Sequence, residues 1–228
     1  PELVTVAGRH ALSCADVVVA DRLAPRALLE ELPAHVELID VAKLPRGRAA
    51  SQDHINDVLI ARAQAGQRVV RFKGGDNFVF GRGFEEVEAC AAAGVPVTVI
   101  PGLSSALAVP ALSGIPVTHR GVAHEFTVVS GHLPPSHPDS LVEWAAVGQM
   151  RGTVVLLMAV ANAGPISAAL MAGGRAADTP VAVIVDGTMP TERVERTSLA
   201  ELADTIERRG LSAPAIIVVG PVVALSDG

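Results

Sequence analysis

The chain has 228 residues, half of them hydrophobic, a size that fits one large domain or two smaller ones. A net charge of -6 and an aromatic content of 3% argue against a nucleic-acid-binding surface, which is usually basic and often aromatic-rich. No apolar run is long enough to cross a bilayer and no signal segment opens the sequence, so we expect a cytoplasmic protein that does not enter a membrane.

The two cysteines, Cys14 and Cys90, both lie in Ala-rich segments of helical character. Neither belongs to a CxxC pair or has a histidine at metal-ligand spacing. We therefore interpret both as small core residues in a reducing compartment and expect no metal site.

In the first half of the chain, short Val- and Ile-rich runs alternate with helical segments, which is typical of an α/β fold with a mainly parallel sheet. The expected strands are Asp16–Ala20, Val36–Val41, Arg68–Phe72 and Val97–Ile100, and the expected helices are Leu3–Ala15, Ser51–Ala65 and Gly83–Ala93. Ser51 is the expected N-cap of its helix, which should end at Gly66. Because such a sheet normally opens with a strand, we expect a further strand before the first helix.

The segment 114–121 contains turn formers without periodicity, and we place a domain boundary there, between residues 1–118 and 119–228. A second set of strands and helices follows it. The strands are Glu125–Ser130, Thr153–Leu157, Val181–Val185, Arg193–Thr197 and Ala215–Val219, and the helices are Ala163–Ala172 and Leu199–Arg209. The sequence thus predicts two α/β domains with mainly parallel sheets.

Ligands of open parallel sheets bind beyond the carboxyl ends of the strands, so the residues after each expected strand are the candidates for chemistry. Nearly all of these positions are polar, glycine-rich or otherwise unusual. They are Asp21-Arg22, Lys43, Lys73-Gly74-Gly75-Asp76, Pro101 to Ser105, Ser130-Gly131-His132, Met158 and Asp186-Gly187-Thr188.

The segment Lys73–Asn77 places two glycines where a backbone can approach a ligand, followed by an acid that can accept hydrogen bonds from an amine or a hydroxyl. An ordinary strand-to-helix turn is the alternative. The chain lacks the GxxxxGK[ST] motif and any GxGxxG motif after a strand, which argues against nucleoside triphosphates and dinucleotides as ligands.

Three charged residues have both a functional and a structural interpretation. Arg82, between two glycines, could bind a carboxylate with two hydrogen bonds or could begin a solvated helix. Asp21 and Lys43 follow consecutive strands and could act as base and acid in one cleft, or could form a plain salt bridge. The uncharged Met158, at a strand end, also has two interpretations, because it could contact a ligand or belong to the core.

Taken together, these motifs resemble one family. Arg68–Glu86 closely resembles the signature KGGDPFxFGRGxEE of uroporphyrinogen-III C-methyltransferases. The segments 17–23, 101–106, 114–120, 130–132, 179–183, 186–188 and 214–220 also resemble motifs of this family, in order and at family spacing.

The resemblance implies a two-domain α/β fold, a homodimer, and S-adenosylmethionine (SAM) bound in a cleft between the domains. It also implies two methylations of uroporphyrinogen III, giving precorrin-2 for sirohaem and cobalamin synthesis. By position, Asp21 matches a proton acceptor and Lys43 a proton donor. The positions that match SAM-binding residues are Gly74, Gly75, Asp76, Val79, Ser104, Ser105, Met158 and Gly187.

The chain departs from the family pattern at three places. The opening GxGPGDP loop has no counterpart, so a SAM contact made there cannot be assigned. Asn77 stands where the family usually has proline, and the usual arginine after Lys43 is replaced, with the basic side chain moved to Arg46.

A many-carboxylate tetrapyrrole requires positive groups despite the negative net charge. We expect these from the strand-exit loops and the segment between the domains, at Arg22, Arg46, Arg82, His119 and Arg120. The alternatives are another corrin-ring methyltransferase, a diphthine synthase, a non-catalytic tetrapyrrole-binding partner, or one module of a longer fusion protein.

Overall fold

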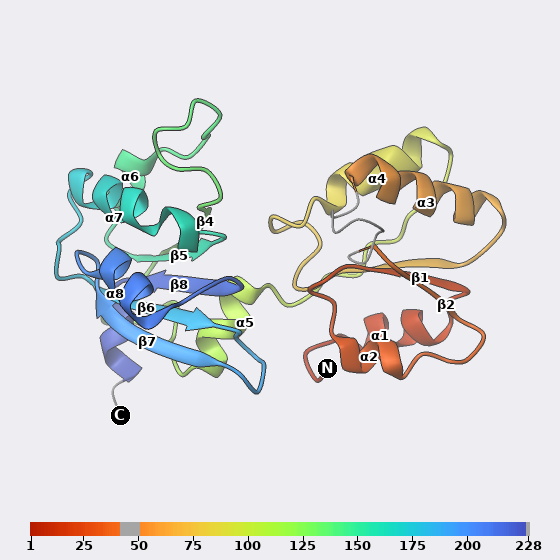
Figure 1. Ribbon diagram of the computed structural model, residues 1–228, viewed down its shortest axis with the longest axis horizontal. Coiled ribbons are helices and arrows are strands. Elements are labelled where there is room, and N and C mark those ends of the chain that lie inside the picture. Colours follow the sequence, from red (N-terminus) through yellow and green to blue (C-terminus); the bar gives the residue numbers. More distant parts are fainter. Residues whose placement is uncertain (42–50, 227–228) are drawn as a thin grey trace. The chain divides into compact units, whose positions relative to one another are not determined.

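A computed structural model describes residues 1–41 and 51–226 and divides the chain into two compact units, Pro1–Ser104 and Ser105–Gly228 (Figure 1). The division lies before helix α5 (Ser105–Leu112), whereas the sequence placed the boundary after Thr118. Helix α5 belongs to the second unit because Ala106 and Val109 are buried in its core. Both units are α/β, in agreement with the predicted fold class.

The first unit is built on a parallel sheet in the order β2-β1-β3. Strand β1 (Val17–Ala20) pairs with β2 (Glu37–Asp40) on one side and β3 (Val69–Phe72) on the other. All four β1 residues are fully buried, which accounts for their uninterrupted apolar sequence. The three strands begin and end at the positions expected from the sequence to within two residues.

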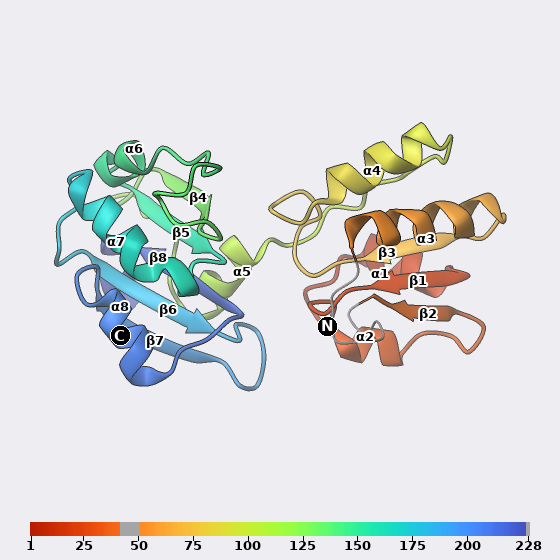
Figure 2. The ribbon, with the colours of Figure 1, turned by 45° about the horizontal axis from the view of Figure 1, so that its top comes forward.

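Helices cover both faces of this sheet, as Figure 1 shows. Helices α1 (Val6–Ser13) and α2 (Arg26–Glu30) pack on one face through Leu12 and Leu28. Helices α3 (Gln52–Gln64) and α4 (Gly83–Ala92) lie together on the other face (Figure 2). The predicted N-cap is confirmed, since the Ser51 hydroxyl accepts a hydrogen bond from the His54 amide at 3.2 Å.

Of the two cysteines predicted to be core residues, Cys90 on α4 is buried, whereas Cys14, directly after α1, is only partly buried, so the prediction is wrong for Cys14. Burial of Cys90, together with the nearby Glu86 carboxylate, raises the pKa of its thiol. The thiol of the unfolded chain loses its proton above about pH 9.0, whereas the thiol of the folded chain keeps its proton to a higher pH. We expect the free energy of unfolding to fall as pH rises above that value, because the native state then binds more protons. Urea titrations of the parent and Cys90→Ala across this range should show the parent losing more stability; equal slopes would contradict the expectation.

The strand expected at Val97–Ile100 is absent from the described sheets. Val97 and Val99 are more than 40% exposed, so their apolar character does not come from burial in a sheet. The segment is held instead at Ile100, whose carbonyl accepts a hydrogen bond from the Asn77 side chain at 2.7 Å.

The second unit contains a five-stranded sheet in the order β4-β5-β8-β6-β7. The strands are β4 (Phe126–Ser130), β5 (Thr153–Leu157), β6 (Pro180–Val185), β7 (Arg193–Ser198) and β8 (Ala215–Val219). Only β4 and β5 pair in parallel, and the other three pairings are antiparallel. The expectation of a mainly parallel sheet is thus wrong for this unit, because β7 follows β6 without a crossover helix and β8 runs back between β5 and β6.

Both faces of this sheet are covered. Val154 and Leu156 of β5 pack into one cluster, while Val155 and Leu157 pack into a second cluster on the other face, as alternation along a strand requires. The helical segments besides α5 are α6 (Trp144–Gln149), η1 (Val160–Asn162), α7 (Ala163–Ala172), α8 (Leu202–Arg209) and η2 (Pro221–Ser226). Within residues 1–41 and 51–226, no helix combines the length and apolar character needed to cross a membrane.

Candidate functional site

The described residues that directly follow observed strands lie at one sheet edge within each unit. In the first unit the three strands are parallel, so the residues after β1, β2 and β3 share an edge. In the second unit β4, β5 and β6 run in one direction, since β6 and β5 are both antiparallel to the β8 strand between them. The exits at Ser130, Met158 and Asp186 therefore lie along one edge of the second sheet.

In the first unit, three backbone segments meet in close contact after the strands. A methyl group at Gly74 would lie 2.6 Å from the Leu23 carbonyl oxygen, and one at Gly102 would lie 2.1 Å from the Gly75 carbonyl oxygen. Gly75 itself has a φ of 75°, a conformation that side chains rarely adopt. The glycines are thus needed for the packing of this turn, and Gly75 remains exposed on its surface.

Asp76 organises the same turn. Its Oδ1 accepts hydrogen bonds from the backbone amides of Phe78 and Val79, at 2.9 and 3.2 Å. Its Oδ2 accepts one from the Gly102 amide at 3.3 Å. The Asp76 carboxylate therefore stabilises the conformation of the loop. It is half-buried, and its remaining lone pairs can accept a hydrogen bond from a ligand.

Arg82 begins α4 in a left-handed conformation, with a φ of 56°. Its Nε and Nη2 atoms donate to the two Glu85 oxygens at 2.9 and 2.7 Å, and this contact raises the pKa of the Arg82 guanidinium and lowers the pKa of the Glu85 carboxyl. Both side chains are more than half exposed. Arg82 thus makes a two-pronged contact with a carboxylate, but this carboxylate is Glu85 of the same chain, and the binding of a substrate carboxylate by Arg82 stays a prediction.

Asp21 follows β1 and is partly buried, with 30% of its side chain exposed. Its Oδ1 accepts from the Leu23 amide at 3.0 Å, and its Oδ2 accepts from Nη2 of Arg71 at 3.3 Å. Arg71 in turn contacts Glu86 of α4, and sequence reasoning assigned a role to neither residue. An arginine inside the apolar strand 69–72, directly before the Lys73 turn, was the signal that could have identified this neighbour.

In the second unit, Met158 follows β5 with its side chain half exposed, so it is not a core residue. Gly187 follows β6 and packs against α5, where a methyl group would lie 2.4 Å from Val109. On the same edge, His132 Nδ1 lies 3.0 Å from the Ser130 hydroxyl, and the Asn162 amide donates to the His132 carbonyl at 3.0 Å. The sequence placed His132 at a strand exit but assigned it no role.

The remaining predicted residues have varied positions. Arg22, His119 and Arg120 are exposed, and the last two lie in a tight turn closed by a bridge between His119 and Ala123. Ser104 ends the first unit and Ser105 begins α5, and neither follows a strand. Lys43 and Arg46 lie outside the described residues, so the pairing of Lys43 with Asp21 and the binding of a substrate carboxylate by Arg46 stay predictions.

Strained backbone is confined to these loops. Among the described residues, the non-glycine residues with positive φ are Phe80, Arg82, Met158, Asp186 and Thr188. All of them lie in turns that the sequence singled out, in both units. Because such conformations cost on the order of 1–3 kcal/mol each and cluster at ligand sites, their location supports a functional role for these turns.

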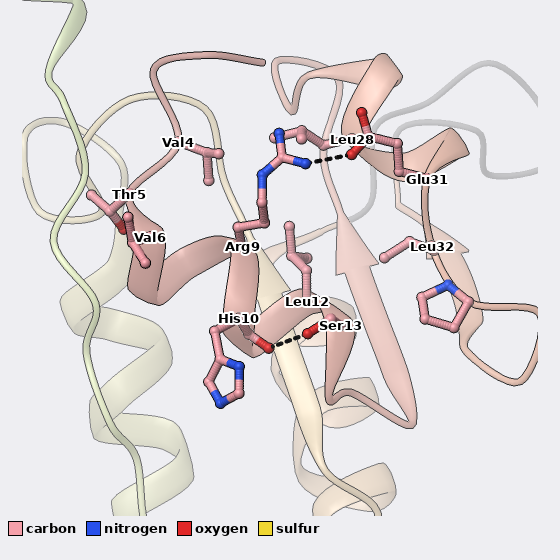
Figure 3. Close-up of a pocket in the computed structure, with 11 residues that line it drawn as sticks. Val4, Thr5, Val6, Arg9, His10, Leu12, Ser13, Leu28, Glu31 and Leu32 are labelled. Atoms are coloured by element: carbon pink, nitrogen blue, oxygen red, sulfur yellow. Dashed lines mark hydrogen bonds and ion pairs between the residues drawn. The ribbon is translucent and has the colours of Figure 1, made fainter.

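A cavity of about 550 Å³ lies elsewhere, between α1 and α2 of the first unit (Figure 3). Apolar side chains such as Val4, Leu12 and Leu28 line it, and the Arg9–Glu31 ion pair crosses it at 2.6 Å. None of the predicted site residues borders this cavity. It is therefore a gap between two helices rather than part of the candidate site.

Comparison with known proteins identifies the family of the chain. The chain is 44% identical over 227 residues to a SAM-dependent uroporphyrinogen III methyltransferase of Methanosarcina barkeri, covering 100% of this chain and 89% of that protein. It is 42% identical to a siroheme synthase of Azotobacter vinelandii, of which it spans 48%. A crystal structure of uroporphyrin-III C-methyltransferase from Thermus thermophilus, complexed with S-adenosylhomocysteine, superposes with a TM-score of 0.83 at 35% identity, covering 99% of this chain and 94% of that one. Because the model of the tetrapyrrole (corrin/porphyrin) methylases also matches residues 1–203, the chain belongs to that family.

Proposed function

We propose that this protein is a SAM-dependent C-methyltransferase that converts uroporphyrinogen III to precorrin-2 by two successive methylations, on the route to sirohaem and cobalamin. The observation that carries the proposal is that the strained turns of both units lie at positions whose sequence resembles the family's motifs and SAM-binding positions. Similarity over the whole chain to a protein named for this activity supports the choice of substrate.

The residues proposed to bind SAM fit such a ligand. Gly75 exposes backbone, Asp76 offers a carboxylate to an amine or a hydroxyl, and the exposed side chains of Val79 and Met158 offer apolar contact. Gly74, Ser104, Ser105 and Gly187 complete the proposed set. Glycine, carboxylate and thioether side chains are a poor match for a triphosphate, in agreement with the absence of phosphate-binding motifs.

The proposed chemistry requires little covalent participation by the protein. SAM supplies a methyl group on a positively charged sulfur, whose bond to carbon breaks with the electron pair remaining on sulfur. The enamine-like electron pair of the pyrrole ring forms the new carbon–carbon bond and leaves the ring cationic. The chain has to align the reacting atoms and exclude water, because proximity and orientation supply most of the rate.

We propose that Asp21 then accepts a proton from the methylated ring, so that the electron pair of the broken C–H bond neutralises the cation. Lys43 is the proposed proton donor on the family resemblance. Arginine and histidine side chains in the exit loops would bind the carboxylates of the tetrapyrrole. The proposed set is Arg22, Arg46, Arg82, His119 and Arg120.

The activity is tested by incubating the protein with SAM and enzymatically made uroporphyrinogen III and measuring the mass of the product. Two added methyl groups on the ring carbons are the expected result. Methylation of a more advanced corrin precursor, with none of uroporphyrinogen III, would identify another corrin-ring methyltransferase. Tetrapyrrole binding without SAM binding would identify a non-catalytic partner.

Replacing Asp76 with alanine should weaken SAM binding by roughly 1.5–3 kcal/mol, the loss expected for a hydrogen bond to a charged group. Titration calorimetry measures this directly. Asp76→Asn is the matched control for the loop, because an asparagine oxygen can still accept from the Phe78 and Val79 amides. Unchanged SAM affinity in Asp76→Ala would contradict the assignment.

We further propose that the protein is a cytoplasmic homodimer. Three phenylalanines of one loop and the helix start after it, Phe78, Phe80 and Phe84, are 50%, 45% and 60% exposed, an apolar group of the kind that marks contact surfaces. The unpaired cysteines are compatible with a reducing compartment. Sedimentation equilibrium should give twice the chain mass, and a monomer at micromolar concentration would refute the proposal.

A further inference from the structure

In the first unit, four charged side chains next to the carboxyl end of β1 are linked by hydrogen bonds and ion pairs. Glu86 of α4 accepts hydrogen bonds from Arg71 Nε at 3.0 Å and from Lys73 Nζ at 3.2 Å. Arg71 Nη2 reaches Asp21 Oδ2 at 3.3 Å. We call Asp21, Arg71, Lys73 and Glu86 the Glu86 cluster. It connects a buried helix position to the proposed base in two steps.

Side-chain exposure to solvent increases along these contacts from Glu86 to Asp21. Side-chain exposure is 7% at Glu86, 8% at Lys73, 13% at Arg71 and 30% at Asp21. Only the end at Asp21 is therefore open to a substrate, and the other three side chains face the protein. Burial, followed by the neighbouring Arg71 charge, lowers the pKa of Lys73, so gathering these charges is unfavourable unless their contacts are kept.

Arg71 is anchored along its whole guanidinium. Nη1 donates to the carbonyls of Val19 and Phe72, both at 3.2 Å, while Nε is engaged by Glu86. The guanidinium is planar and rigid, so fixing Nε and Nη1 also fixes the direction of Nη2. Lysine at this position could supply the charge but could not hold these partners together.

Glu86 has more partners than a surface carboxylate. Besides Arg71 and Lys73, the Gln52 side chain of α3 donates to its Oε1 at 3.2 Å. Two cations and one amide therefore converge on one buried carboxylate. Two of the partners belong to the strand and turn that lead to Gly74 and Asp76, and the third belongs to the neighbouring helix.

We infer that Glu86 is a positioning residue for methyl transfer, which holds the Arg71 guanidinium in the orientation that fixes the Asp21 carboxylate. This inference rests on the proposed role of Asp21 as the base. Glu86 does not touch the reacting atoms, and acts through Arg71. The Leu23 amide holds Oδ1 of Asp21 and Arg71 holds Oδ2, so the carboxylate has a defined direction toward a proton.

A double-mutant cycle tests the inference, using single-turnover methylation at saturating SAM. Glu86→Gln should slow methyl transfer by about 100-fold, the effect of misplacing a reacting group by about 1 Å, with little change in the KM for the tetrapyrrole and in SAM affinity. In the Asp21→Asn background, the same change should add no further slowing. Glu88→Gln, an exposed glutamate of the same helix, should leave the rate unchanged.

Each of the other outcomes contradicts a specific step of the inference. If the slowing by Glu86→Gln is the same with and without Asp21, or if Glu86→Gln methylates at the parent rate while Asp21→Asn is slow, Glu86 does not act through Asp21. If Asp21→Asn itself methylates at the parent rate, the proposed base is wrong and this inference falls with it. Should Glu86→Gln fail to fold, Arg71→Lys takes its place, with the same expected slowing and the same loss of effect in Asp21→Asn.

Discussion

Replacing Asp21 with asparagine is expected to slow methyl transfer by about 100- to 10,000-fold, the range for loss of one acid–base group. Folding should be little affected, because asparagine keeps an acceptor for the Leu23 amide and partly exposed ion pairs contribute only about 0–1 kcal/mol. Single-turnover methylation, melting temperature and SAM affinity should be measured on the same preparation.

Asp16→Asn is the matched control for this experiment. Asp16 precedes the same strand, β1, and also accepts a backbone hydrogen bond, from the Arg68 amide at 2.6 Å. It lies at the opposite end of the sheet from the proposed site, so its replacement should leave the methylation rate unchanged. If Asp21→Asn instead melts far below the parent while its folded fraction methylates normally, Asp21 is a structural partner of Arg71 and not a base.

Replacing Glu86 with alanine is expected to lower the free energy of unfolding of the first unit by about 3–5 kcal/mol. The change removes the carboxylate that Arg71 and Lys73 share and leaves two cations in a buried site without it. Urea denaturation followed by circular dichroism would measure the loss.

Glu85→Ala provides the comparison on the neighbouring residue of the same helix. Glu85 pairs with Arg82 at the surface, where water solvates both partners, so its loss should change stability much less. Equal destabilisation by the two substitutions would show that burial does not determine how much the Glu86 carboxylate contributes to the free energy of unfolding.

Local patterns predicted much of the fold, because they depend on neighbouring residues. Thr153–Leu157 and Ala163–Ala172 occur as expected, since a continuous apolar run and an alanine-rich segment each have one favourable conformation in a buried setting. Helix α5 was not predicted, because Pro110 lies inside it and tertiary packing against the second sheet overrides the proline.

Pairing directions and side-chain partners depended on contacts that a single sequence does not show. The hairpin of β6 and β7 could have been inferred from the short turn at 186–192, but the insertion of β8 beside them could not. At the site, the sequence identified Asp21, Asp76 and Arg82 by type and position. It did not identify Arg71 and Glu86 as neighbours of Asp21, because ion pairs between residues far apart in the chain follow from packing. Glu85 lies only three residues from Arg82, a helical spacing that the sequence does show.

Strand β8 lies in the middle of the second sheet although its residues, 215–219, come after those of every other strand in that sheet. During synthesis, β4, β5, β6 and β7 therefore emerge from the ribosome before the strand that joins them, whereas the sheet of the first unit is formed by residues 17–72. The first unit can fold while translation continues, but the second must keep the edges of β5 and β6 unpaired until β8 arrives. Such long-range pairing slows folding and exposes open strand edges, so the second unit is the part of a nascent chain on which we expect chaperones to act.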